Sequence, residues 1–161
     1  MFNNYLLLFF PLAITLHNIE EALWLPQWSR HASKYHQPVG KTEFHFALII
    51  ITALAYLVTF FRVITPDVVF ISWLFYGFLG VMIINTVFPH LIATIALKKY
   101  APGLFTGLFL IIPINSILIY RAIVFGFITM MEVIIATAVV GILLILIIPL
   151  LFKAGRRLIN Y

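Results

Sequence analysis

Long runs of apolar residues without a charged side chain constrain this chain more than any other feature. Residues 5–16 and 22–28 carry no charge, and longer runs follow in the second half of the sequence. Of the 161 residues, 64% are hydrophobic and only 9% are charged. A soluble domain of this length could not bury so much apolar surface, and the runs are too continuous for barrel strands. The sequence therefore predicts an all-α integral membrane protein.

Proline, glycine and charged residues divide these runs into about five transmembrane helices, which we expect to form a single domain over residues 1–161. The predicted helices span about residues 5–25, 43–61, 68–99, 104–120 and 124–152. Pro26 ends the first one, because proline lacks the N–H that a helix interior requires. The first helix is kept as a membrane span, since no basic segment precedes it and no small-residue cleavage site follows it.

The distribution of lysine and arginine predicts the orientation in the membrane, because short cytoplasmic loops carry an excess of both. With five helices, one side receives Arg30, Lys34, Lys41, Lys98, Lys99, Lys153, Arg156 and Arg157. The other side receives only Arg62 and Arg121. We therefore expect a multi-pass protein of the plasma membrane with its N-terminus outside and its C-terminus in the cytoplasm.

Three ionisable residues interrupt the first apolar segment, in the sequence His17-Asn18-Ile19-Glu20-Glu21. Charged groups at this depth in a membrane are costly, and they usually mark a functional site. On a helix, residues three and four positions apart are neighbours, so both carboxylates lie beside the imidazole of His17. A histidine flanked by two carboxylates offers nitrogen and oxygen ligands for a metal ion, or groups for proton transfer.

Two further histidines lie at a similar depth in the predicted cytoplasmic leaflet. At 1.5 Å per residue, His17 and His90 each lie about 12 Å inward from the cytoplasmic ends of their helices. Glu20 and Glu21 lie roughly 6–8 Å inward, and His45 roughly 5 Å. Such residues should face the interior of the bundle, so we expect them to meet. Pro89, directly before His90, predicts a kink that opens space for a ligand.

These positions resemble a family of bacterial membrane proteins named for its HxxEE motif. The family shares that motif, one further histidine and a Tyr-x-Pro-Gly motif, which correspond here to His17, Glu20, Glu21, His90, Tyr100, Pro102 and Gly103. The resemblance spans about residues 10–120 and implies that these positions belong together. It implies no activity, and His45 and Glu132 are not part of the pattern.

The leading hypothesis from the residues is a metal-dependent intramembrane enzyme, most simply a hydrolase. His17, His90 and either Glu20 or Glu21 would bind a divalent ion, with His45 as a fourth ligand; zinc fits best, and iron and manganese also fit. The second glutamate would act as general base on the bound water, and Tyr100 would direct its hydroxyl into the site. The substrate would be a lipid or a membrane-tethered molecule in the cytoplasmic leaflet.

Two other classes of function stay open. Histidine and glutamate inside a membrane also serve carriers of protons or divalent metals, although the chain lacks the internal repeat of many transporters. Alternatively, the cluster could be a buried ion pair in a non-catalytic membrane subunit. The chain contains no cysteine and no basic patch interleaved with aromatics, which argues against thiolate chemistry and nucleic-acid binding. The sequence is compatible with a homo-oligomer.

The remaining polar residues of the spans have simpler expected roles. We expect Asn85 and Asn115 to form hydrogen bonds between helices, and His31 and His36 to be solvated in a loop. Glu132 lies in the outer half of the last predicted helix, where Arg62 or Arg121 could pair with it in a second polar site.

Overall fold

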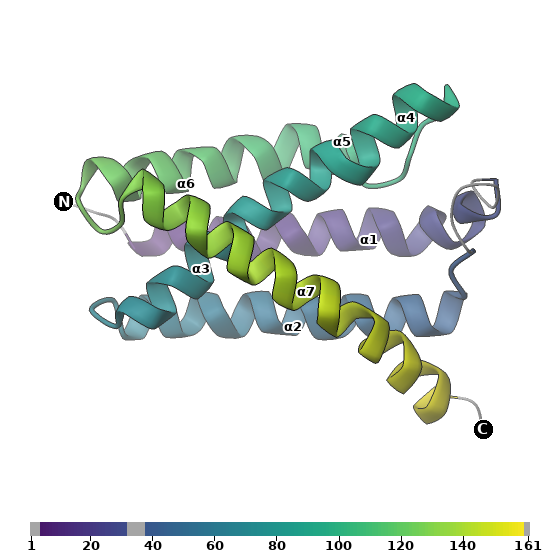
Figure 1. Ribbon diagram of the computed structural model, residues 1–161, viewed down its shortest axis with the longest axis horizontal. Coiled ribbons are helices and arrows are strands. Elements are labelled where there is room, and N and C mark those ends of the chain that lie inside the picture. Colours follow the sequence, from purple (N-terminus) through teal and green to yellow (C-terminus); the bar gives the residue numbers. More distant parts are fainter. Residues whose placement is uncertain (1–3, 32–37, 160–161) are drawn as a thin grey trace.

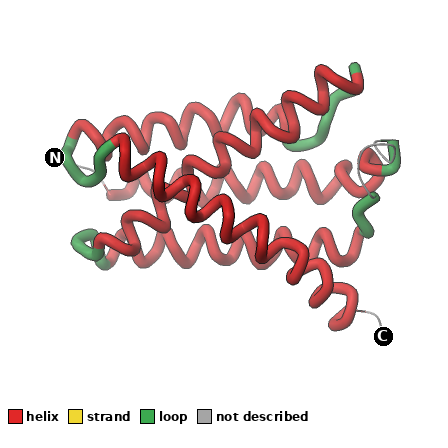
Figure 2. The backbone as a smooth tube through the Cα atoms, in the orientation of Figure 1, coloured by secondary structure: helices red, strands yellow, loops and turns green. Residues whose placement is uncertain are grey.

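The computed structural model describes residues 4–31 and 38–159, and every regular element in these two ranges is helical (Figures 1 and 2). Five helical segments are long and apolar enough to cross a membrane: Tyr5–Ser29, Lys41–Ile64, Val69–Leu97, Leu104–Val124 and Met130–Leu158. The predicted fold class, a membrane protein with five spanning helices, is therefore confirmed. The orientation across the membrane stays a prediction.

The first two helices extend beyond their predicted C-terminal ends. After the short 3-10 helix η1 (Asn4–Leu8), helix α1 runs from Phe9 to Ser29 and continues through Pro26; α2 runs from Lys41 to Ile64. Proline removes one hydrogen bond from a helix, the one to the carbonyl four residues earlier. That carbonyl, of Ala22, instead lies 2.8 Å from Nε2 of His45 on α2. The neighbouring helix thus satisfies the backbone group that Pro26 leaves free.

The third and fourth spans are each interrupted by a π-helical segment. The third consists of α3 (Val69–Asn85), the π-helix η2 (Thr86–Leu91) and α4 (Ile92–Leu97), with non-helical backbone at Phe88. The fourth consists of α5 (Leu104–Thr106), the π-helix η3 (Gly107–Ile111) and α6 (Ile112–Val124). Such segments often occur at functional sites. Here they adjoin each other, since a Cβ on Gly107 would lie 2.5 Å from Thr86.

The last helix, α7, begins at Met130, six residues later than expected, and ends at Ile159. Gly126 adopts a φ of +74° in the turn before it. Thr129 and Glu132 then form a capping box: the Thr129 N–H donates to the Glu132 carboxylate at 2.8 Å, and the Glu132 N–H donates to the Thr129 hydroxyl at 3.2 Å. Glu132 therefore stabilises the start of α7. Among the described residues it forms no salt bridge with Arg62 or Arg121, the partners that the sequence suggested.

Helix α7 packs across α3 and α2 (Figure 1). Its contact with α3 depends on small residues, because a Cβ on Gly77 would lie 2.6 Å from the carbonyl oxygen of Ala136. The core holds large apolar side chains, among them Phe10, Phe75, Tyr76 and Leu79. Helix α1 packs against α2 and the fourth span. Its polar residues His17 and Glu21 also reach Asn85 and His90 on the third span.

Candidate metal centre

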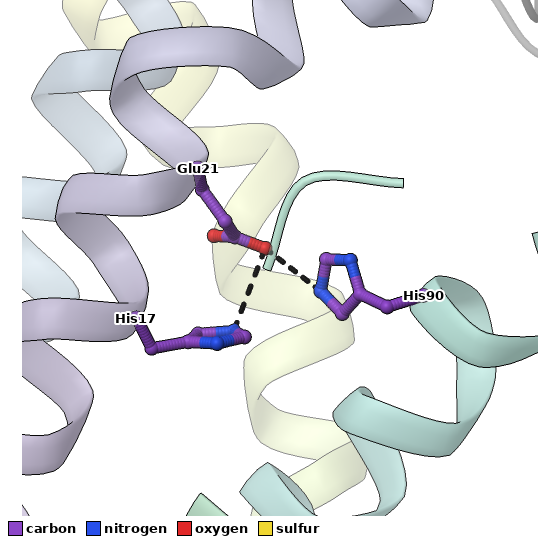
Figure 3. A group of neighbouring side chains, drawn as sticks. All are labelled: His17, Glu21 and His90. Carbon is purple, nitrogen blue, oxygen red and sulfur yellow. Dashed lines mark ion pairs between the residues drawn. The ribbon is translucent and has the colours of Figure 1, made fainter. Parts of the chain in front are cut away.

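His17, Glu21 and His90 meet inside the helical bundle (Figure 3). Their exposed fractions are 0%, 9% and 2%. One carboxylate oxygen of Glu21, Oε1, lies 2.9 Å from Nε2 of His90 and 3.6 Å from Nε2 of His17. Each residue can offer one ligand atom such that all three atoms lie within 4.8 Å of one another. The structure thus brings together three of the five residues that the sequence suggested as ligands.

Two of the three separations between these atoms are close to those of a small tetrahedral ion. With bonds of about 2.0–2.1 Å, the ligand atoms of a tetrahedral zinc site lie about 3.3 Å from one another. The Glu21 distances of 2.9 and 3.6 Å bracket this value. Two imidazole nitrogens and one carboxylate oxygen are also a ligand set of catalytic zinc sites. The residues present therefore fit a divalent transition-metal ion.

Asn85, at the end of α3, completes the surroundings of the two imidazoles. Its amide nitrogen lies 3.3 Å from Nε2 of His17 and 3.2 Å from Nε2 of His90. Rotating the amide by half a turn would present its oxygen at the same place. The expectation that Asn85 forms hydrogen bonds between helices holds for its contact with His17 on α1. Its contact with both histidines was not expected.

Thr106 determines which nitrogen of His17 carries a proton. The Thr106 hydroxyl lies 2.6 Å from Oε2 of Glu20 and 3.1 Å from Nδ1 of His17. The hydroxyl has one proton, and an ionised carboxylate can only accept, so that proton goes to Glu20. His17 must then donate from Nδ1 to the Thr106 oxygen. In the neutral imidazole this leaves a lone pair on Nε2, the nitrogen that faces Glu21 and His90.

Glu20 itself points away from the cluster, toward the segment that joins α4 to α5. It accepts hydrogen bonds from the Tyr100 hydroxyl, the Gly103 N–H at 2.8 Å, and the Thr106 N–H at 2.9 Å, besides the Thr106 hydroxyl. Two of these donors are backbone groups at the start of a helix, where negative charge is favoured. Glu20 is therefore fully engaged by donors and lies outside the group of three ligand-type side chains.

The Tyr-x-Pro-Gly motif packs directly against the cluster. Gly103 has a φ of +96°, and a Cβ there would lie 2.7 Å from Cε1 of His90 and 3.0 Å from Cε1 of His17. Only glycine fits this backbone conformation and this space. Tyr100 donates to Glu20 and accepts from the Phe105 N–H at 3.0 Å. Burial, together with the hydrogen bond to Glu20, raises the pKa of Tyr100 to about 12, so its hydroxyl stays a donor.

The structure does not bring His45 to this cluster. Its Nε2 is hydrogen-bonded to the Ala22 carbonyl, and its side chain lines a separate groove between α1 and α2. His31 is exposed, as expected, and His36 lies outside the described residues.

Asn115, in turn, donates to the Leu79 carbonyl at 3.0 Å, which is the interhelical role expected of it.

A groove borders the cluster on the side of Glu20. This groove, here called the Tyr100 groove, has a volume of about 900 Å³. It is lined by Leu16, Ile19, Glu20, Leu23, Trp24, Gln27, Trp28, His31, Lys99, Tyr100, Pro102, Phe105, Thr106 and Leu110. Glu20 and Thr106 form part of its wall, and Thr106 contacts His17 behind that wall.

Comparison with known proteins identifies the family of this chain. Residues 8–118 match the family described as "Protein of unknown function with HXXEE motif", and the chain belongs to that family. The "Uncharacterized protein YrkK" of Bacillus subtilis (strain 168) is 56% identical over 153 residues, which cover 95% of this chain and 97% of that protein. No solved structure matches the chain.

Proposed function

We propose that this HXXEE protein is a metal-dependent intramembrane enzyme, and that it hydrolyses a lipid or membrane-tethered substrate in the cytoplasmic leaflet. The ligands would be Nε2 of His17, a carboxylate oxygen of Glu21 and Nε2 of His90. The observation that carries this proposal is the buried His/Glu/His cluster, whose distances suit a tetrahedral ion, beside a groove open to an apolar substrate.

The chemistry of the ligand atoms favours zinc, with iron and manganese as alternatives. Imidazole nitrogen suits zinc and iron, whereas calcium and magnesium prefer sites made of oxygen alone. A bound zinc ion would supply a water molecule acidified toward neutral pH. Three protein ligands leave a fourth position for that water, provided that the amide of Asn85 moves aside or donates to it.

Glu20 fits a positioning role better than the general-base role expected from the sequence. Its oxygens already accept four hydrogen bonds, which stabilise the ionised form and leave little capacity to accept a proton. Through Thr106 it instead fixes the protonation and the orientation of His17, as partners behind metal-bound histidines commonly do. His45 is left out of the proposed ligand set because Ala22 occupies its Nε2.

Tyr100 is the polar group best placed to meet a substrate. Its side chain lines the groove, and its hydroxyl is next to Glu20. Because its single proton is donated to Glu20 and one lone pair accepts from the Phe105 N–H, Tyr100 would offer its second lone pair to a donor on the substrate, while Glu20 and Thr106 hold His17 in place.

Metal analysis of the full-length protein in mild detergent tests the proposal. We expect near-stoichiometric metal in the unmodified protein and its loss in His17→Ala, His90→Ala and Glu21→Gln. His31→Ala removes an exposed histidine outside the cluster and is the matched control, which should keep its metal. A folded, chelator-free protein without metal would contradict the proposal. Metal flux into proteoliposomes that depends on His17 would instead favour a carrier.

A further inference from the structure

We propose that the Tyr100 groove binds one acyl chain of an anionic phospholipid, with the headgroup at Lys99. That this lipid is the substrate rests on the proposed function, whereas its binding does not. The inference depends on three features of the groove: its length, the positive charge of Lys99 in its lining, and its contact with the candidate metal centre through Glu20 and Thr106.

The groove has the dimensions of one lipid chain in one leaflet. It follows α1 from Leu16 to Trp28, which at 1.5 Å per residue is about 18 Å. The hydrocarbon core of a bilayer is about 30 Å thick, so one leaflet contributes roughly half of that. Most of the lining is apolar, including Leu23 and Phe105, both of which are exposed. An extended lipid acyl chain in the surrounding leaflet therefore matches the groove in length, and both are apolar.

The groove lining carries a positive charge. Lys99 is the one lysine or arginine among the described lining residues, and its side chain is exposed. Glu20 is the one acidic residue among them, and its oxygens are already engaged by donors. A phosphate group would supply the negative charge that Lys99 attracts.

A second groove on the same helix differs from the Tyr100 groove in charge. The groove between α1 and α2 has a similar volume, about 880 Å³, and the described residues that line it include His45 and Tyr56 but no lysine or arginine. The Tyr100 groove differs by its lysine and by its contact with the metal centre through Glu20 and Thr106.

Contact between lipid and protein can be measured through the protein's own tryptophans. Trp24 and Trp28 both line the groove, and bromine on an acyl chain quenches indole fluorescence at short range. Full-length protein in neutral detergent would be titrated with phosphatidylglycerol that carries brominated chains, and in parallel with phosphatidylcholine that carries the same chains. We expect phosphatidylglycerol to reach half-maximal quenching at an about fivefold lower concentration, since one lysine near an anionic group contributes about 1 kcal/mol.

Variants of matched charge identify the groove as the source of this preference. Lys99→Gln should abolish the preference for phosphatidylglycerol, and Lys99→Arg should keep it. Lys153→Gln removes the same charge from exposed α7 and should leave the preference unchanged. Equal quenching by the two lipids in the unmodified protein, or an equal effect of the two glutamine variants, would overturn the inference.

Metal content measured in the same samples separates this inference from the proposed function. A preference for phosphatidylglycerol in a protein without metal would support the lipid site and contradict the enzyme. Bound metal without any lipid preference would overturn the lipid site and leave the metal centre standing.

Discussion

Replacing Gly103 by alanine tests how closely the Tyr-x-Pro-Gly motif controls the metal centre. The added Cβ would lie 2.7 Å from Cε1 of His90, and ordinary contacts begin at 3.4 Å, so the ring would have to shift by about 0.7 Å. Metal–ligand distances tolerate only about 0.2 Å. The substitution removes no ligand atom, but we expect it to weaken metal binding by about 10–100-fold, as disruption of groups behind the ligands does.

Gly126→Ala is the matched control for this experiment. Gly126 also has a positive φ, +74°, but an added Cβ would meet nothing within 4 Å. Both variants should lose about 1–2 kcal/mol of folding stability from the strained backbone. Only Gly103→Ala should lose metal affinity, measured by competition with a chromophoric chelator in detergent. Equal affinity in the two variants would refute the argument that Gly103 makes room for the imidazoles.

Three further predictions follow from individual hydrogen bonds. Thr106→Val should weaken metal binding by about tenfold or more, because His17 loses the acceptor that holds its Nδ1 proton, and Thr106→Ser should restore the affinity. His45→Phe should cost about 1–3 kcal/mol in thermal unfolding, because the Ala22 carbonyl loses its partner; its metal content should not change, and loss of metal would make His45 a ligand after all. At pH 11, the ultraviolet difference between the unmodified protein and Tyr100→Phe should show about a tenth of one phenolate, given a pKa of about 12, whereas an ordinary tyrosine would be mostly ionised.

The helices could be predicted from the sequence because membrane spans depend on length and hydropathy alone. Their ends and interruptions could not, since these depend on contacts with other helices. Helix α1 continues through Pro26, and the Ala22 carbonyl that loses its partner within the helix is hydrogen-bonded to His45 on α2 instead. The expected kink near Pro89 is present as non-helical backbone at Phe88, but the sequence gives no sign of the π-helix that surrounds it. The turn before α7 depends on Gly126 and on the capping box of Thr129.

Part of the candidate site could be predicted because the depth of a residue in the membrane depends only on its position along the helix. Depth in the membrane correctly placed His17 and His90 in one layer, because rise per residue is constant along a helix. Depth could not distinguish Glu20 from Glu21, because neighbouring residues differ by only about 1.5 Å along the helix axis but by about 100° around it. It also placed His45 with the cluster, although His45 faces α1 at Ala22. Thr106 carries no charge, so nothing in the sequence singled it out. Asn85 was expected only to form hydrogen bonds between helices, and its contact with both histidines depends on how the third span packs against α1.

Two consecutive glutamates are what allow one helix to serve both sides of the site. Neighbouring residues on an α-helix point about 100° apart, so Glu21 can face the histidines while Glu20 faces the loop after α4. Burying a second carboxylate costs several kcal/mol, and four hydrogen bonds to a charged group, each contributing about 1.5–3 kcal/mol, can offset that cost. Those bonds come from Tyr100, Gly103 and Thr106, so they also hold Gly103 against the two imidazoles. The histidines, the glutamates and the Tyr-x-Pro-Gly motif therefore form one unit. Loss of Glu20 would remove the acceptor of the loop's hydrogen bonds, and loss of Glu21 would remove one of the three proposed ligands.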